Sequence, residues 1–363
     1  MKVAVIAPLV SAIREPQQGG SQAFVSDLAR GLGVRGHEVH VYAASGSQIP
    51  GAVVIDTGID PGSLAATLYR ASDSAIRDSA VSASAFARVY SRVRQTKYDV
   101  VHNHAFDAPA IELAIELGSA VVHTLHLPPD AAIAAALRTA ARHSPPPAVA
   151  AVSAFQARTW SHVVAVDAIL PPYVPTGAIP WSAAAGQGAV FAGRLSPEKG
   201  AAEAIDIAQA AGIAIDLYGD TYDAEYARQQ IHPRSETPGV TINPGVPRTT
   251  LWAAMARAAV VLCPAKWDEP FGMAAAESQA CGTPVVAFRR GGLGEMIADN
   301  VTGYLVAPDD ISAATDSVLR AGGISRAACR DHAERHLDLE RSLDAHEQLY
   351  ERVVTSGAGA VRE

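Results

Sequence analysis

The chain has 363 residues, enough for two domains, and 49% of them are hydrophobic, so it can bury large cores. Its formal net charge of −8 favours neither a nucleic-acid partner nor attraction to an anionic membrane. No apolar run is long enough to span a bilayer, so we expect no stable membrane insertion. The three cysteines lack the spacing of a metal site and are typical of reduced thiols. Because residues 1–8 predict a strand rather than a signal peptide, we expect a cytoplasmic protein.

The first half of the chain alternates predicted strands and helices. Residues 2–7 form a buried strand, a loop over 11–20 ends in Gly19-Gly20, and a helix over 22–34 follows. This order places a phosphate-binding loop at a helix N-terminus, although a tight turn that needs a positive φ explains the glycines about equally well. The spacing Gly-x-Gly-x-x-Gly is absent, which argues against a dinucleotide site.

Residues 64–97 are predicted to be mostly helical, with basic residues toward the end of the segment: Arg88, Arg92, Arg94 and Lys97. A basic amphipathic helix could make peripheral contact with a membrane surface or with an acidic acceptor. A solvated face with cations near a helix C-terminus is the favoured interpretation.

Two histidines follow predicted strands in this half. The strand over 99–104 ends in His104, and the strand over 119–125 is followed by His126. In open parallel sheets, ligands bind beyond the carboxyl ends of the strands. For His104, lining an acceptor cleft and stabilising its own loop both stay open. A proline-rich segment over 171–180 then predicts a domain boundary between residues 172 and 173.

The second half opens with a strand that delivers Arg194 and Lys199 onto a loop before a helix from residue 201. Two cations five residues apart on such a loop suit a diphosphate, whose charge must be neutralised as it leaves; two unrelated surface cations are the alternative. The sequence contains no Asp-x-Asp, which is the usual metal-bridged diphosphate motif. We therefore expect Arg194, Lys199 and helix N-termini to neutralise the diphosphate without a metal ion.

A stretch over 266–287 places two carboxylates around the start of a helix. Glu269 precedes the predicted helix over 272–280, and Glu277 lies about two turns into it, so their backbones can be on the order of 10 Å apart. That span suits a nucleotide sugar, with Glu269 on hexose hydroxyls and Glu277 on a ribose diol. Between them, the free N–H groups of the helix N-terminus favour negative charge. Gly282 ends the helix, and a buried strand over 283–288 follows.

Glu269 and Glu277 form a Glu-x7-Glu motif within Glu-Pro-Phe-Gly-Met and before Ala-Cys-Gly-Thr-Pro-Val-Val. These strings resemble the retaining GT-B glycosyltransferases of family 4, the glycosyl transferases group 1. The Gly-Arg-Leu…Lys-Gly string that contains Arg194 and Lys199 is similar to that family too, as is His-Thr-x-His over 123–126. The resemblance implies an α/β fold of two doubly wound Rossmann-like domains that face a central cleft. They span 1–172 and 173–337, and a C-terminal helix over 338–356 packs back on the first.

The resemblance also implies the chemistry of individual residues. The nucleotide sugar, a UDP-sugar on family frequency, would bind the second domain as substrate, with no other cofactor, and the acceptor would enter over the first. The implied catalytic residues are His126, Glu269, Arg194 and Lys199, with His126 on the donor sugar near its reacting carbon. The implied donor-binding residues are Gly20, Val246, Pro247, Phe271, Gly272, Met273 and Glu277. Relatives that share Trp-Asp-Glu-Pro-Phe-Gly resemble transferases acting on small molecules, so a soluble acceptor is favoured.

Two other functions stay open at this point. A GT-B epimerase would release an isomerised sugar without any acceptor. A two-lobed protein that only binds a sugar nucleotide would not need the Arg194/Lys199 and Glu269/Glu277 sets together. A phosphorylase is disfavoured, because no pyridoxal-lysine motif is recognisable. The sequence makes no prediction of the oligomeric state.

Overall fold

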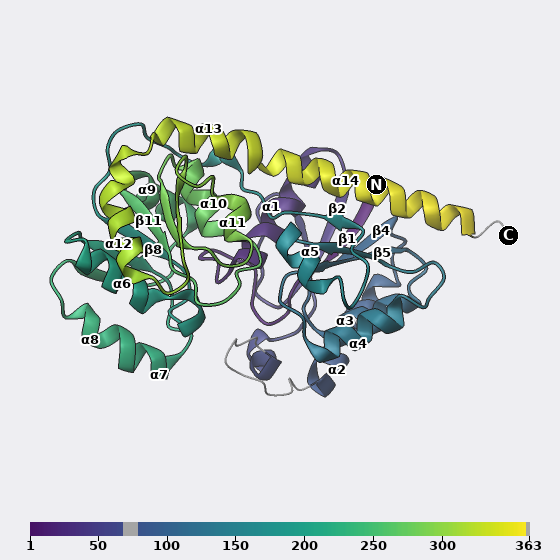
Figure 1. The fold of residues 1–363 in the computed structure, drawn as a ribbon. Coiled ribbons are helices and arrows are strands. Elements are labelled where there is room, and N and C mark those ends of the chain that lie inside the picture. The colour runs from purple at the N-terminus through teal and green to yellow at the C-terminus, as the bar shows by residue number, and fades with distance from the viewer. Residues whose placement is uncertain (68–78, 361–363) are drawn as a thin grey trace. The chain divides into compact units, whose positions relative to one another are not determined.

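The computed structural model describes residues 1–67 and 79–360, and the chain divides into two compact units (Figure 1). The first unit comprises Met1–Arg14, Ser21–Pro172 and Glu340–Glu363, and the second comprises Glu15–Gly20 and Tyr173–Leu339. The segment Glu15–Gly20 differs from the sequence prediction, which placed it in the first domain. Its contacts explain the difference, since the Glu15 carboxylate accepts a hydrogen bond from the backbone N–H of Arg248 at 3.1 Å.

The described part of the first unit contains a parallel sheet of seven strands in the order β3-β2-β1-β4-β5-β6-β7. β1 and β4 are neighbours, with Ile6 opposite Asn103 at their carboxyl ends. The chain runs outward from β1 in one direction and from β4 in the other, which makes this junction the switch point of a doubly wound fold. The strands are β1 Lys2–Ile6, β2 Glu38–Ala43, β3 Val53–Asp56, β4 Val100–Asn103, β5 Ala120–Leu125, β6 Ala148–Ala151 and β7 Ala168–Ile169.

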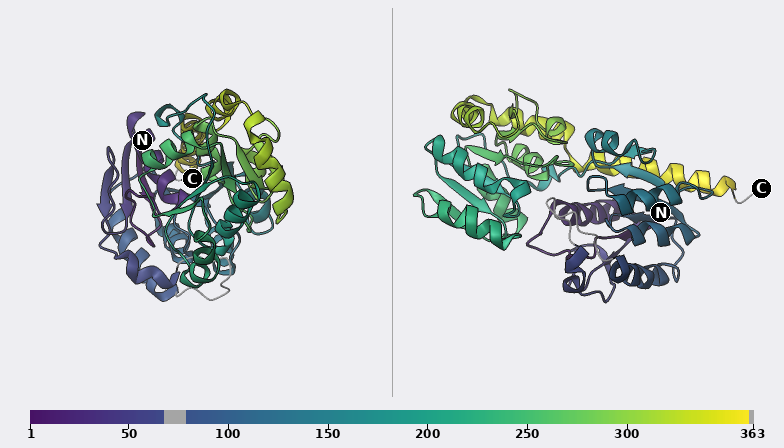
Figure 2. Two further views of the ribbon diagram at one scale, coloured as in Figure 1. Left: turned by 90° about the vertical axis from the view of Figure 1, so that its left-hand side faces the viewer. Right: turned by 60° about the horizontal axis from the view of Figure 1, so that its bottom comes forward.

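Helices lie on both faces of this sheet (Figures 1 and 2). α1 and α14 pack closely, since a Cβ added to Gly31 would lie 2.6 Å from Cδ1 of Leu343. α3 packs against both α2 and α4, and the apolar side chains between these helices and the strands form the core of the unit. The helices of the first unit are α1 Gly20–Val34, α2 Ser79–Val93, α3 Ala108–Glu112, α4 Ala131–Ala140, α5 Ala154–Trp160 and α14 Leu339–Ala360.

The predicted helical segment over 64–97 is only partly described. Pro61–Thr67 forms a 3₁₀-helix, α2 begins at Ser79, and residues 68–78 lie outside the described part of the chain. Of the basic residues, Arg92 lies in the last turn of α2 and donates to the backbone carbonyl of Asp56. Arg94 follows the helix and pairs with Glu116 at 3.0 Å. All four basic residues, Arg88, Arg92, Arg94 and Lys97, are exposed, as a solvated face requires.

The C-terminal helix packs on the first unit, as the sequence analysis predicted, although it begins at Leu339 rather than at residue 338. The Arg35 guanidinium pairs with three carboxylates of α14, those of Glu340, Asp344 and Glu347, at 2.6, 2.8 and 2.6 Å. Among residues 1–67 and 79–360, no helix combines the length and the apolar character needed to cross a lipid bilayer.

The second unit has the same kind of sheet, with its described strands parallel and in the order β10-β9-β8-β11-β12-β13. Its switch point lies between β8 and β11, which pair through Val190 and Val261. β12 is buried along its whole length, as expected for a parallel strand covered on both faces. The strands are β8 Ala189–Ala192, β9 Ile215–Tyr218, β10 Val240–Asn243, β11 Val260–Cys263, β12 Val285–Phe288 and β13 Gly303–Val306.

Two layers of helices accompany this second sheet (Figure 2). α6 packs against α12, and α10 packs against α9 and α13. The main helices of the second unit are α6 Ala201–Ala210, α9 Arg248–Arg257, α10 Met273–Ala280, α12 Ile311–Arg320 and α13 Arg326–His336, with shorter turns at α7 Ala224–Tyr226, α8 His232–Ser235 and α11 Leu293–Met296. Both units are therefore Rossmann-like, as predicted.

Candidate functional site

The switch point of the second sheet brings two loops together. β8 ends at Ala192 and β11 ends at Cys263, so the loops that carry Arg194 and Glu269 leave neighbouring strands at the same edge. The backbone N–H of Lys266 donates to the carbonyl of Glu198 at 2.9 Å, which ties the two loops to each other. Gly200 has a φ of 74°, and an added Cβ there would lie 1.9 Å from the Pro264 carbonyl oxygen, so only glycine allows this approach. This edge is where open α/β sheets bind ligands.

Lys199 and Glu269 form an ion pair across these loops. The Lys199 ammonium donates to both carboxylate oxygens of Glu269, at 2.9 and 2.7 Å. The indole N–H of Trp267 donates to Oε2 of the same carboxylate at 2.8 Å. The Lys199 Nζ also lies 5.0 Å from the centre of the Trp267 ring, within the range of a cation–π contact. A cation, an anion and an aromatic ring thus meet at the end of β11.

Arg194 lies on the same loop as Lys199 but has other partners. Its guanidinium pairs with the buried Glu198 at 3.2 Å and lies 4.2 Å from the centre of the Tyr222 ring. The structure therefore brings both predicted cations to the loop after β8 and orients each of them through a separate carboxylate. Planar stacking on an aromatic ring suits a guanidinium better than an ammonium.

The backbone of Glu269 is held by the glycine-rich turn after β12. The N–H of Gly292 donates to the Glu269 carbonyl at 2.6 Å. Gly291 has a φ of 57°, and an added Cβ would lie 2.2 Å from that same carbonyl oxygen. Any side chain at position 291 would push Glu269 out of place, so the turn fixes the loop that carries Glu269.

Glu277 lies in α10 and forms a buried pair with Arg248, the first residue of α9. The Nε and Nη2 atoms of Arg248 donate to Oε1 of Glu277 at 3.0 and 2.8 Å. Both bonds end on one oxygen, and the carboxylate has a second oxygen with which to accept bonds from a ligand. The predicted nucleobase contacts, Val246 and Pro247, directly precede Arg248, and Pro247 is the N-cap of α9.

The start of α10 collects four further predicted residues. Gly272 is the N-cap, with a φ of 108°, and Met273 is the first helical residue. A Cβ added to Gly20 would lie 3.0 Å from Sδ of Met273, so the loop Glu15–Gly20 reaches this helix start. The Phe271 side chain is only 4% exposed, and its ring lies 6.0 Å from that of Tyr173. The Phe271 side chain therefore packs inside the second unit.

Cys263 ends β11 beside this group. Burial and the nearby Glu269 charge raise the pKa of its thiol to about 12. The thiol stays protonated at neutral pH and is not a thiolate nucleophile. Among the described residues, no group of three or more His, Cys, Asp or Glu side chains is placed to hold a metal ion.

The predicted histidines lie at the switch point of the first unit. His104 Nδ1 and His126 Nε2 share a hydrogen bond of 2.9 Å, and the ring of His104 lies 4.0 Å from that of His102. His104 is fully buried, which favours the second of the two roles left open for it, that of stabilising its own loop. Burial lowers the pKa of His126 to about 4, so its imidazole is neutral at pH 7.

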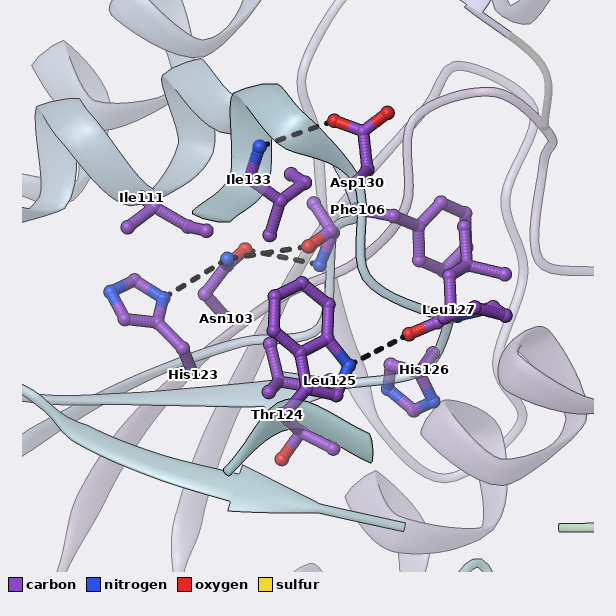
Figure 3. Close-up of a pocket in the computed structure, with 13 residues that line it drawn as sticks. Asn103, Phe106, Ile111, His123, Thr124, Leu125, His126, Leu127, Asp130 and Ile133 are labelled. Carbon is purple, nitrogen blue, oxygen red and sulfur yellow. Dashed lines mark hydrogen bonds between the residues drawn. The ribbon is translucent and has the colours of Figure 1, made fainter. Parts of the chain in front are cut away.

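A small cavity lies beside these histidines within the first unit. Its volume is about 20 Å³, room for about one water molecule and too little for a sugar. Figure 3 shows His123 directed at Asn103 on one side of the cavity and His126 beside Leu127 on the other. His123 is buried and burial lowers its pKa to about 3, as expected for the structural role that its place in the strand predicts.

Sequence reasoning missed three residues of the second-unit group: Trp267, Tyr222 and Arg248. A signal for Trp267 was available, since an indole two residues before a functional carboxylate can reach it in a loop. Arg248 lies 29 positions from Glu277, and nothing in its local sequence marks it. Glu277 needs a cationic partner because it is buried in the folded chain. Its burial cannot be read from the local sequence, so the sequence gives no reason to look for Arg248.

Family models match both halves of the chain. The model described as Glycosyltransferase Family 4 matches residues 18–177, and the model described as Glycosyl transferases group 1 matches residues 187–335. The D-inositol 3-phosphate glycosyltransferase of Segniliparus rotundus is 34% identical over 183 residues, which are 46% of this chain and 40% of that protein. The chain thus aligns with less than half the length of this curated relative.

Solved structures match the chain along nearly all of its length. Sucrose-phosphate synthase from Thermosynechococcus elongatus has a TM-score of 0.78 at 18% identity, with 98% of this chain and 99% of that chain covered. HepE from Anabaena, solved in complex with UDP-glucose, has a TM-score of 0.74 at 17% identity, with 98% and 100% covered. At these identities the likeness establishes the fold, which is the GT-B arrangement of two Rossmann-like domains.

Proposed function

Because the chain belongs to the family 4 (group 1) glycosyltransferases with the GT-B fold, we propose that it is a retaining enzyme. It moves a hexosyl unit from a nucleoside-diphosphate sugar to a hydroxyl group of a small acceptor. The observation that carries the proposal is the meeting of Arg194, Lys199 and Glu269 at the switch point of the second sheet. Two cations at that edge, each beside a carboxylate, suit a diphosphate with a polyhydroxylated group attached.

The donor then lies along the carboxyl end of the second sheet. Arg194 and Lys199 neutralise the diphosphate, and the N-terminus of α10 adds its N–H groups and positive dipole end. Glu269 accepts hydrogen bonds from the hexose hydroxyls. The second carboxylate oxygen of Glu277 accepts from the ribose while Arg248 holds the first. The base lies near Val246 and Pro247.

The reaction needs a proton acceptor but no protein nucleophile. The bond between the anomeric carbon and the phosphate oxygen breaks, and the acceptor oxygen bonds to the same face of that carbon. The leaving phosphate takes the proton of the acceptor hydroxyl. Positive charge that develops on the anomeric carbon strengthens the hydrogen bonds of Glu269, so this residue acts mainly in the transition state. The neutral His126 supplies a hydrogen bond to the sugar.

Two comparisons support the substrate classes. HepE, which shares the fold, was solved with UDP-glucose, and this supports a UDP-sugar as the donor. The relative from Segniliparus rotundus is named for D-inositol 3-phosphate, and this supports a small polyol or phosphorylated polyol as the acceptor. We propose UDP-sugars and soluble polyols as the first substrates to test.

A nucleotide screen followed by a transfer assay tests this function. At ~100 times its dissociation constant, the correct nucleoside diphosphate adds ~2.7 kcal/mol of stability, which thermal melting with UDP, GDP, ADP and dTDP detects. The matching α-linked sugar nucleotide is then incubated with soluble polyols in EDTA. We expect an α-glycoside, identified by its anomeric proton coupling.

Three outcomes contradict parts of the proposal. A β-glycoside would exclude retention. An isomerised sugar released without acceptor would identify an epimerase. Turnover that stops in EDTA and returns with Mg²⁺ would show that Arg194 and Lys199 do not suffice for the diphosphate.

A further inference from the structure

The two side chains that we assign to the donor, Lys199 and Glu269, form an ion pair with each other. Lys199 is placed for the diphosphate and Glu269 for the hexose, yet the Lys199 ammonium donates to both oxygens of the Glu269 carboxylate, at 2.9 and 2.7 Å. The side chains are only 22% and 16% exposed, so water screens this pair less than it screens a surface pair. Donor binding must therefore compete with the ion pair.

Lys199 is the partner that can move. Its ammonium sits on a flexible four-carbon stem with rotatable donors. Glu269 is restrained twice, through its carboxylate by the Trp267 indole N–H at 2.8 Å and through its carbonyl by the Gly292 N–H at 2.6 Å. When Lys199 turns to a phosphate, the Glu269 carboxylate stays where it is and loses one of its two charge-assisted contacts.

The consequence differs between the intact donor and its product. A nucleotide sugar brings hexose hydroxyls that can replace the ammonium on Glu269. A bare nucleoside diphosphate brings none, so it draws Lys199 away and leaves a half-buried carboxylate short of donors, which is unfavourable. The ion pair thus weakens the binding of the nucleoside diphosphate more than it weakens the binding of the nucleotide sugar.

We propose that the Lys199–Glu269 pair selects the intact nucleotide sugar over the nucleoside diphosphate and so promotes release of the spent nucleotide. The inference rests on the proposed function, since it takes the diphosphate to Lys199 and the hexose to Glu269. Lys199 exchanges partners in each cycle, from carboxylate to diphosphate and back, while Trp267 and the turn at Gly291 and Gly292 keep the carboxylate in position.

The test is calorimetric titration of two probes into the full-length protein and its variants. The probes are UDP and UDP-glucose, or the GDP, ADP or dTDP pair that the thermal screen selects. In Glu269→Gln the ammonium loses its ionic partner, so we expect the nucleoside diphosphate to bind about three- to tenfold more tightly than to the wild type. The intact donor should bind about tenfold more weakly, because the hexose loses a charged acceptor.

The matched control is Asp206→Asn, which removes a carboxylate from another ion pair of the same unit, that with Arg234 at 2.8 Å. It should change neither affinity. Lys199→Met should weaken both probes by about tenfold or more, because it removes the cation itself. If Glu269→Gln fails to fold in thermal melting, Glu269→Asp shortens the side chain by one methylene and should also tighten the nucleoside diphosphate.

The outcomes separate this inference from the proposed function. Unchanged or weaker binding of the nucleoside diphosphate to folded Glu269→Gln, with Lys199→Met impaired, would overturn the selection role and leave the donor site intact. If Lys199→Met binds both probes with wild-type affinity, Lys199 does not contact the diphosphate, and the inference is overturned as well. If none of the four nucleoside diphosphates binds the wild type, the donor assignment is wrong and the inference falls with it.

Discussion

Trp267 is the residue whose role the structure adds most clearly to the site. Its indole N–H donates to Oε2 of Glu269 at 2.8 Å, while its ring lies under the Lys199 ammonium. The hydrogen bond fixes the carboxylate plane. In the proposed reaction this carboxylate faces a developing positive charge, which requires it to be held in one orientation. We therefore regard Trp267 as a positioning residue for Glu269.

Trp267→Phe keeps an aromatic ring near Lys199 and removes the N–H donor. A hydrogen bond to a charged group contributes about 1.5–3 kcal/mol, so we expect kcat to fall by about tenfold or more with a smaller change in KM. Trp252→Phe is the control, because the buried indole N–H of Trp252 has no hydrogen-bond partner among the described residues. Steady-state kinetics compare kcat and KM of the two variants, and thermal melting checks that both are folded. Equal losses of kcat in both would exclude a specific role of Trp267.

At this scale the sequence predicted that Lys199 and Glu269 lie at the same sheet edge, but it did not predict that they bind each other. Lys199 and Glu269 meet because β8 and β11 are neighbours, which follows from the predicted fold. That they bind each other follows only from side-chain geometry. The sequence left two roles open for His104, and the family resemblance placed Phe271 among the donor-binding residues. Both side chains are buried, and burial is a property that the motifs do not reveal.

At the scale of elements, a group of histidines joins strands β4 and β5 to the C-terminal helix. His102 shares hydrogen bonds with Tyr350 of α14 at 2.6 Å and with Thr124 of β5 at 2.7 Å. His346 of α14 lies against His102 and Phe24, with ring centres 5.5 and 5.7 Å away. Burial lowers the pKa of His102 and His104 well below the ordinary value, and it lowers the pKa of His126 and His346 to about 4.

These shifts give the first unit a defined pH dependence. Each histidine binds its proton more weakly in the folded state than in the unfolded state, so the stabilisation is present above about pH 6.5 and is lost as the pH falls toward 4. Between pH 8 and pH 5, His126 and His346 should each lower the free energy of unfolding by about 2 kcal/mol. Chemical denaturation at a series of pH values measures the slope.

Two variants test whether the buried histidines of the first unit cause this pH dependence. His346→Gln should make the slope shallower, because it removes one buried titrating ring while keeping a donor for the Ser342 carbonyl. His143→Gln changes an exposed histidine and should leave the slope unchanged. A slope that is the same in the wild type and in His346→Gln would contradict the account of α14 docking.

Element boundaries show where local sequence signals stop being sufficient. The predicted strand over 283–288 begins only at Val285. Pro284 has no N–H to donate to the sheet, and the Thr283 hydroxyl donates instead to the Met255 carbonyl at 2.7 Å. The hydrophobic run was predicted correctly, but Thr283 bonds to α9, while the Pro284 carbonyl accepts a hydrogen bond from the Val261 N–H of β11 at 3.0 Å.

At the scale of the whole molecule, both units repeat one strand order, and this follows from the alternating strand and helix pattern of the sequence. The chain gives no local sign that Glu15–Gly20 belongs with the second unit. That assignment depends on contacts with Arg248 and Met273, which lie more than 200 residues away in sequence. Long-range contacts of this kind are properties of the folded chain.

In the proposed function, the nucleotide of the donor binds at the β8–β11 switch point of the second unit. Hydrogen-exchange mass spectrometry with and without the nucleoside diphosphate tests it most directly, because it reports on every part of the chain at once. We predict slower amide exchange over 193–200 and 264–277, where the two loops and the start of α10 lie. Protection confined to the strand ends of the first unit, over 104–107 and 126–130, would contradict the account.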